Sequence, residues 1–188
     1  MTVTIVVLVA ALTVVTVAAW VLPRVLPQRL WAFATLTLLV ALGLLAVLAG
    51  PDADLTGLPA RSVLVDLALV AVLGGGPVTS TVLWLVDQGS SRPDTLAMAG
   101  EVLRGGAWIG AFERCAVFAA LASGWPEGLA VVLALKGLGR YSELKAGGPT
   151  ASGEALATGG VAERFIIGTF ASVLWASACA GTFLALTR

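Results

Sequence analysis

The sequence predicts an all-α integral membrane protein, a bundle of about six transmembrane helices with the N-terminus and the C-terminus outside. Hydrophobic residues make up 59% of the 188 residues and charged residues only 12%, and the mean hydropathy is +0.99. A soluble domain typically contains about 45–50% apolar and about 25% charged residues. The apolar residues also gather in long runs that short polar segments separate. So much apolar surface cannot be hidden in one globular core, and lipid is therefore the expected solvent.

The first half of the chain contains three predicted spans. Residues 3–22 form an apolar run of about the 20 residues that a helix needs to cross the hydrocarbon core. The segment PRVLPQR, with its prolines and arginines, ends this run. Residues 30–50 form the second span, in which Trp31 is the expected interfacial anchor. A polar loop that contains proline then leads into the third span, residues 62–86.

A helix break is predicted inside the third span, at the segment GGGP. Gly74, Gly75 and Gly76 weaken a helix through their conformational freedom. Pro77 removes a backbone hydrogen bond to the preceding turn. Broken helices in membranes are tolerated where they are buried in protein or line a watery cavity. Two interpretations stay open: the hydroxyls of residues 79–81 face a polar lumen, or they bond back to a closely packed, kinked helix.

The second half of the chain contains three further predicted spans. A connector in which residues 95–104 are expected to form a short surface helix leads into the fourth span, residues 107–123. The turn GWPEG joins it to the fifth span, residues 129–141. A loop rich in Gly, Ser and Thr precedes the sixth span, residues 161–186. We therefore expect residues 1–188 to form a single integral membrane domain.

The distribution of basic residues predicts the orientation of these spans. Cytoplasmic loops carry an excess of Lys and Arg. With the N-terminus outside, the predicted inner side carries Arg24, Arg29, Arg92, Arg104, Lys136, Arg140, Lys145 and Arg164, and the outer side Arg61 and Arg188. No basic residue precedes the first apolar run, unlike in a signal peptide, so a retained first helix is expected. Arginine, alanine and valine usage is typical of a GC-rich bacterium, and a multi-pass protein of the bacterial cytoplasmic membrane is the expected location.

The composition excludes several kinds of chemistry. The chain contains no histidine, which removes histidine-based catalysis and histidine-ligated metals. The net charge is zero, so no overall field attracts nucleic acid. Cys115 and Cys179 lie in apolar runs, where small packing residues are expected rather than a disulfide or a reactive thiol. We expect no metal, no cofactor and no nucleic-acid partner. The expected partners are membrane lipids and either a second copy of the chain or a partner membrane subunit.

Two adjacent charges lie inside the fourth predicted span. Glu113 and Arg114 begin roughly 7–8 Å beyond Trp108, at 1.5 Å per residue. A charged side chain at the bilayer centre costs at least about 2.5–3.5 kcal/mol, so such residues usually have partners or functions. Adjacent helical residues point about 100° apart and do not face each other. We therefore expect Glu113 and Arg114 to seek partners on different helices.

Other charges lie at the inner ends of neighbouring spans. Lys136, Arg140 and Glu143 recur at helical spacing in the fifth span and share a face. Glu163 and Arg164 open the sixth span, and Asp87, which ends the third, is a further candidate partner. We predict a substrate- or ion-binding group, called the charged set below, that consists of Glu113, Arg114, Lys136, Arg140, Glu143, Glu163 and Arg164. The alternatives are interfacial anchoring of the basic side chains and structural pairing between helices.

The segments IGAFERCAVF, ALKGLGRYSELK and AERFIIGTFASVLWA resemble an uncharacterised bacterial family of small polytopic membrane proteins, a domain of unknown function. The resemblance covers residues 105–181, and it implies that the charged set acts as a unit without implying an activity. Separately, GGGPVTSTVL is similar to the triple-glycine helix break of the trimeric intracellular cation channels. The acidic–basic sequence that follows this break in those channels, and its second copy, are both missing here.

Three functions follow from the charged set. The first, which the sequence favours, is a carrier or channel in which Arg114, Lys136 and Arg140 attract an anionic group and Glu113 and Glu163 balance charge or relay protons. The second is a non-catalytic accessory or scaffold subunit of a membrane complex. The third is an intramembrane enzyme acting on a lipid or isoprenoid, with Glu113 as general acid or base. The lack of histidine and of a paired-aspartate metal motif argues against an enzyme.

Overall fold

The computed structural model describes residues 2–22, 25–49, 55–88, 106–146 and 155–187. The side chains of residues 49, 106, 140–146 and 155–162 lie outside this description. The described residues form six helices and no strand. These are α1 (Thr2–Val21), α2 (Gln28–Ala49), α3 (Leu58–Asp87), α5 (Gly106–Ala122), α6 (Glu127–Ala146) and α7 (Ala155–Leu186). The predicted all-helical class is confirmed, and the surface helix predicted at residues 95–104 lies outside the described residues.

Four of the helices are long and apolar enough to cross a membrane. They are α1, α2, α3 and the part of α7 from Glu163 to Leu186. The helix α5 has 17 residues, or about 26 Å at 1.5 Å per residue, slightly less than a hydrocarbon core of about 30 Å. The helix α6 is continuous, but charged residues interrupt its apolar sequence in the second half. These four apolar helices are compatible with a membrane protein.

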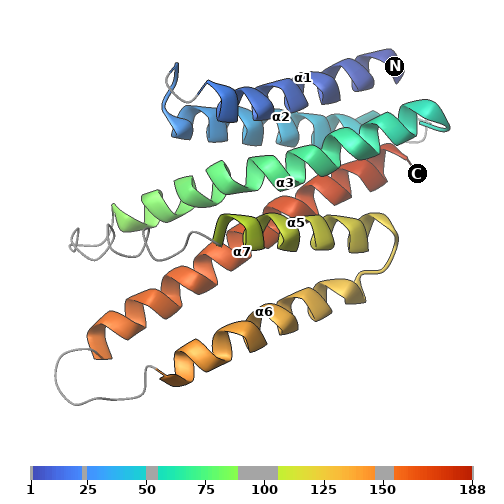
Figure 1. The fold of residues 1–188 in the computed structure, drawn as a ribbon. Coiled ribbons are helices and arrows are strands. Elements are labelled where there is room, and N and C mark those ends of the chain that lie inside the picture. The colour runs from blue at the N-terminus through green and yellow to red at the C-terminus, as the bar shows by residue number, and fades with distance from the viewer. Residues whose placement is uncertain (1, 23–24, 50–54, 89–105, 147–154, 188) are drawn as a thin grey trace.

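The helix α3 is the central element of the fold. It packs against α1 and α2 on one side and against α5 and α7 on the other, and α7 crosses beneath it in Figure 1. The hairpin of α1 and α2 forms one edge of the bundle, and α6 forms the opposite edge, where it packs mainly on α5. Both ends of the chain lie at the same end of the bundle (Figure 1). Residues that contact several helices are therefore most numerous along α3.

The core consists of apolar residues at helical spacing. Ile5, Val9 and Leu12 on α1 are at most 1% exposed, and they recur at i, i+4 and i+7, one face of a helix. Leu67 and Val70 on α3 are fully buried and belong to the same cluster. Side chains from α1, α2, α3, α5 and α7 contribute to this cluster, whose buried members on the central helix run from Val63 to Val78.

Large apolar side chains also cover the outward faces of the helices. Val3 on α1 is 76% exposed, Leu48 on α2 is 83% exposed and Leu58 on α3 is 79% exposed. A helix that is apolar on all faces is either buried in a large protein or surrounded by lipid. The outward faces thus match an apolar solvent rather than water.

The helix α3 continues without interruption through the GGGP segment, so the predicted break is not formed. Pro77 has no N–H for the carbonyl of Leu73, one turn earlier. The Trp20 indole supplies the missing donor, with Nε1 3.0 Å from the Leu73 oxygen. The hydroxyls of Ser80 and Thr81 donate to the Pro77 carbonyl at 2.9 and 2.8 Å. Ser80 and Thr81 thus bond back to the helix, as the packed interpretation of this segment expected, and helical structure continues through the segment.

A glycine turn places α6 beside α5. Gly124 has a φ of +76°, the left-handed conformation that glycine adopts without steric cost. The N–H of Trp125 donates to the carbonyl of Ala120 at 2.8 Å, and the N–H of Gly124 donates to Leu121 at 3.1 Å. This pair of bonds is the Schellman arrangement that ends many helices, and Pro126 follows it directly. The chain therefore reverses tightly, and α6 returns along α5.

Candidate functional site

Arg114 lies inside the bundle, at the place where α3, α5 and α7 meet. The residue is only 7% exposed. Its Nε donates to the carbonyl of Val72 on α3 at 3.0 Å, and its Nη1 donates to the hydroxyl of Ser172 on α7 at 3.3 Å. Among the described residues, the guanidinium hydrogen-bonds to these neutral groups and to no carboxylate. One buried side chain therefore links three helices.

Two glycines of α3 make room for large side chains at this place. A Cβ on Gly75 would overlap the Cδ of Arg114 and lie 2.6 Å from its Nε. A Cβ on Gly74 would lie 2.7 Å from the Trp175 ring. Gly110 on α5 is also close, because a Cβ there would lie 3.1 Å from the Arg114 Nη1. The glycines thus form a socket for these two side chains rather than a flexible hinge.

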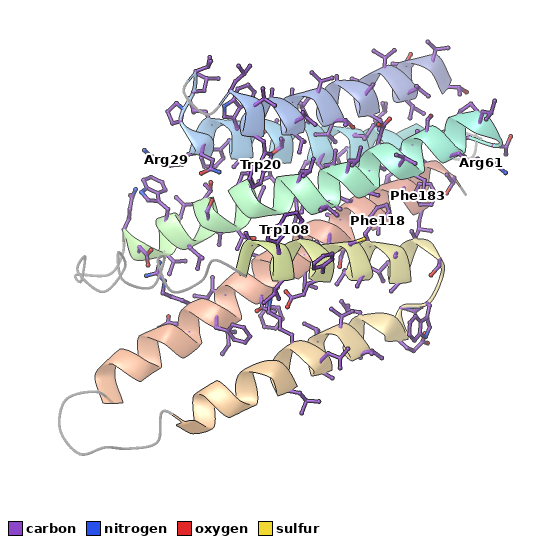
Figure 2. All side chains as sticks on the ribbon, viewed as in Figure 1. Trp20, Arg29, Arg61, Trp108, Phe118 and Phe183 are labelled. Atoms are coloured by element: carbon purple, nitrogen blue, oxygen red, sulfur yellow. The ribbon has the colours of Figure 1, made fainter. Side chains whose placement is uncertain are left out.

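Side chains from three helices donate to backbone carbonyls within a single turn of α3. The bonds are Trp175 Nε1 to Val70 O (3.2 Å), Arg114 Nε to Val72 O (3.0 Å) and Trp20 Nε1 to Leu73 O (3.0 Å). Trp20 reaches α3 from α1, as Figure 2 shows. We call the residues of these bonds, with the two α3 glycines, the α3 junction. A carbonyl oxygen has two lone pairs, so those of Val70 and Val72 can accept a side-chain donor beside the helical one, whereas the Leu73 oxygen has no helical donor because residue 77 is proline.

Glu113 points away from the α3 junction and pairs with Lys136. The Lys136 Nζ donates to the Glu113 Oε2, and the two side chains are 18% and 15% exposed. The same ammonium lies 5.5 Å from the ring centroid of Phe165, a cation–π contact. Lys136 thus connects α6 to both α5 and α7. The expectation that Glu113 and Arg114 face different helices is confirmed.

A second ion pair joins α3 to α7. The Nη2 of Arg164 donates to the Oδ2 of Asp87, and the two side chains are 33% and 20% exposed. Asp87 is the last residue of α3, so this pair lies where the helix ends. It ties the end of the central helix to the neighbour with which it packs most extensively.

The structure divides the charged set into separate groups. Glu113 pairs with Lys136, Arg164 pairs with Asp87, and Arg114 belongs to the α3 junction. Glu163 is exposed on α7. The remaining two members of the set lie on α6, and their side chains are outside the described part: Arg140 and Glu143. Their participation in a common site stays a prediction.

Five residues of the α3 junction were not predicted from the sequence. They are the donors Trp20 and Trp175 and the acceptors Val70, Val72 and Leu73, and Ser172, which accepts from Arg114 beside the junction, was not predicted either. Two signals were present, because a buried indole N–H needs an acceptor and a helical proline leaves a carbonyl without its donor. Neither signal identifies which helix provides the matching group. Only the packing of the helices brings the two together.

Among the described residues, neither the carboxylates nor the two cysteines are grouped as a metal site or a disulfide would require. No group of three or more His, Cys, Asp or Glu in the described ranges is arranged to hold a metal ion. Cys179 is free and fully buried in the core cluster, which is the packing position expected of it. Cys115 is free and exposed on α5.

No protein-family model, no curated protein and no solved structure matches the chain. The resemblances drawn from sequence segments therefore stay predictions, and the arrangement of side chains is the basis for a functional proposal.

Proposed function

We propose that this chain is a multi-spanning membrane protein that acts as a non-catalytic accessory or scaffold subunit, with its charges fastening helices to one another. The observation that carries the proposal is that each described link made by Glu113, Arg114 and Arg164 joins two different helices. Glu113 is bound to Lys136 on α6, and Arg114 is bound to α3 and α7. Charged residues in membranes commonly pair with one another or with backbone carbonyls inside a bundle. Glu113 and Arg114 thus find their hydrogen-bond partners within the chain itself.

From the basic residues and the composition, we further propose a six-span topology in the bacterial cytoplasmic membrane with both termini outside, and the ion pair between α5 and α6 fits the hairpin that this topology requires. The helices α5 and α6 cross as a hairpin in this proposal. The ion pair between them replaces two unpaired charges in the hydrocarbon by one neutral pair. The other charged residues of the second half of α6 lie closer to the C-terminal end of that helix. The Gly124 turn joins the two helices tightly enough for such a hairpin. Exposed apolar residues along all six helices then face lipid or a partner subunit.

A carrier-like function, in which the bundle passes an anionic group or a proton, is the second candidate. It is favoured by polar atoms between α3 and α7 that the described residues do not satisfy. The hydroxyl oxygens of Thr79 and Thr169 are buried without a hydrogen-bond partner in the described part of the chain. The cation of Arg114 is held nearby on the same pair of helices by neutral groups. Buried polar groups without partners are uncommon and invite a functional explanation. The enzyme alternative gains no comparable observation.

A double-mutant cycle on Glu113 and Lys136 tests the main proposal. Glu113→Gln and Lys136→Met each leave one partner uncompensated, which costs up to about 3–5 kcal/mol for a buried pair. The double variant removes both charges and is expected to recover most of that loss. The measurement is the midpoint of thermal unfolding of purified protein in detergent. Glu127→Gln, in the exposed first turn of α6, is the matched control and should behave like the wild type.

The two candidate functions give opposite results in this cycle. Singles that unfold early and a double that recovers support fastening of helices. Singles that unfold like the wild type, but abolish proton or anion flux through reconstituted liposomes, would replace the scaffold proposal with the carrier. Because stability and flux are measured on the same preparations, misfolding cannot be mistaken for loss of transport.

A further inference from the structure

A pocket of about 340 Å³ lies between the start of α2 and the last turns of α3. It is lined by Pro27, Gln28, Arg29, Ser80, Thr81 and Trp84. The pocket contains no member of the charged set, so it is separate from the groups described above. It is a shallow hollow that is largely open to the surroundings, so a ligand there would keep part of its surface exposed. Figure 2 shows Arg29 and Arg61 at opposite ends of the bundle, which places the pocket at one end only.

Arg29 supplies a cationic donor whose hydrogen-bonding edge is free. Its guanidinium carbon lies 4.2 Å from the centroid of the Trp84 ring. Stacking on an aromatic face orients a guanidinium but uses none of its five N–H donors. Among the described residues, Arg29 makes no ion pair or hydrogen bond through its side chain. A planar fork of free N–H groups matches the oxygens of a phosphate.

The two hydroxyls of the pocket are acceptors, not donors. Ser80 and Thr81 both donate their hydroxyl protons to the carbonyl of Pro77, at 2.9 and 2.8 Å. A hydroxyl has one proton and two lone pairs, so these oxygens offer only lone pairs to a ligand. The pocket therefore combines a positive donor, Arg29, with the neutral acceptors of Ser80 and Thr81, beside the amide of Gln28, which has both kinds of group. A matching ligand carries an anionic oxygen and, close to it, a group with N–H or O–H.

We propose that this pocket binds the headgroup of a phospholipid whose phosphate carries ethanolamine or glycerol, and that it discriminates against choline. The phosphate pairs with Arg29, and the ammonium or hydroxyl of the headgroup donates to Ser80 and Thr81. Choline has no N–H or O–H and cannot make the second contact. Trp84 has the position of an interfacial tryptophan, near the end of α3. Leu30, Phe33 and Leu85, which lie within four residues of Arg29 or Trp84 in the chain, are exposed apolar side chains to which acyl chains could attach.

This inference needs a membrane location but is independent of the scaffold and carrier proposals. A competition experiment tests it by native mass spectrometry of the purified full chain with equal amounts of phosphatidylethanolamine, phosphatidylglycerol and phosphatidylcholine. The wild type is expected to retain the first two about fivefold more than the third, the factor of one net hydrogen bond. Arg29→Gln removes the contact to the phosphate, which all three lipids share, and should lower the retention of all three. Arg61→Gln removes an exposed arginine at the other end and should leave the retention of each lipid as in the wild type.

A second variant separates the two contacts without touching the charge. Ser80→Ala combined with Thr81→Val removes both acceptors, and retention of phosphatidylethanolamine and phosphatidylglycerol should fall to that of phosphatidylcholine. Equal retention of all three lipids by the wild type would overturn the proposal, as would identical behaviour of Arg29→Gln and Arg61→Gln. Inorganic phosphate and glycerophosphoethanolamine, added at the lipid concentration, distinguish a lipid from a free phosphate ligand. The lipid should stay bound in both cases, and its displacement by either competitor would contradict the lipid assignment.

Discussion

At the scale of residues, the two adjacent charges of α5 are stabilised in different ways. Glu113 has a cationic partner, Lys136. Arg114 has a carbonyl and a hydroxyl instead, and the nearby Glu113 charge adds favourable electrostatics without a hydrogen bond. Arginine suits such a role because its donors point in several directions from one rigid plane. The Arg114 side chain fits only because the facing residue on α3, Gly75, has no side chain.

Gly75→Ala tests the socket directly. The added Cβ would overlap the Arg114 side chain, so the guanidinium must move or the helices must separate. We expect the free energy of unfolding to fall by about 1–3 kcal/mol, as for overpacked cores. Unfolding is measured in detergent by circular dichroism at 222 nm with increasing denaturant.

Gly137→Ala is the matched control for this substitution. Gly137 also lies within a helix, but no atom lies within 4 Å of an added Cβ. Its replacement should leave stability unchanged or raise it by up to about 1 kcal/mol through helix propensity. Equal effects of the two alanines would show that Gly75 serves no packing role.

At the scale of elements, α3 is held in place by its neighbours at the one turn where its own bonding is incomplete. Pro77 removes a donor, and Trp20 replaces it from α1. Arg114 and Trp175 bind carbonyls of the same turn from α5 and α7. A proline inside a membrane helix is tolerated where neighbouring groups satisfy the freed backbone in this way. At the α3 junction, hydrogen bonding of the α3 backbone therefore depends on the packing of α1, α5 and α7.

This coupling predicts that Trp20 and Pro77 are energetically linked. Trp20→Phe removes the donor to Leu73 and is expected to cost about 1 kcal/mol. In the Pro77→Ala background the new N–H can bond to Leu73, so the same change should cost less. The double-mutant cycle should show a coupling of about 0.5–1 kcal/mol in unfolding free energy. Any change in interfacial anchoring by the indole is common to both backgrounds and cancels. Strictly additive effects would mean that Trp20 does not complete the helix.

At the scale of the whole molecule, the central helices share one extensive core, whereas α6 at the edge contacts mainly one other helix. The helices α1, α2, α3 and α7 share one core and have the length and composition of spans. The helix α6 packs mainly on α5 and is fastened by the Lys136 ion pair. Its apolar residues Leu135 and Leu138 are 65% and 69% exposed. A scaffold subunit would use such an edge, whereas the centre maintains the fold.

Cysteine labelling tests the proposed orientation of the bundle. The two native cysteines, Cys115 and Cys179, are first replaced by serine and alanine. Single cysteines are then introduced as Thr2→Cys, Gln88→Cys and Thr187→Cys. A membrane-impermeant thiol reagent applied to intact spheroplasts should label positions 2 and 187, and position 88 only after permeabilisation. The reverse pattern would contradict the orientation predicted from the basic residues, and different labelling of the two termini would contradict an even number of spans.

The local features of this chain followed from its sequence. Helix positions depend on runs of apolar residues and on prolines and glycines nearby in the chain. The ends of the predicted spans accordingly lie within six residues of the observed helix ends, and the largest difference is at the start of α7, predicted at residue 161 and observed at Ala155. The divergence of Glu113 and Arg114 was likewise predictable, because it is a property of a single helix.

The partners of those side chains were decided only by the tertiary structure. The sequence predicted one charged set, whereas the described contacts place its members in separate groups. The glycines predicted a break, and they form a socket for Arg114 and Trp175 in a continuous helix. A hydropathy pattern determines that a helix forms and where it ends. The rotation and depth of each helix against its neighbours determine which donor meets which carbonyl, and these depend on packing between segments far apart in the chain.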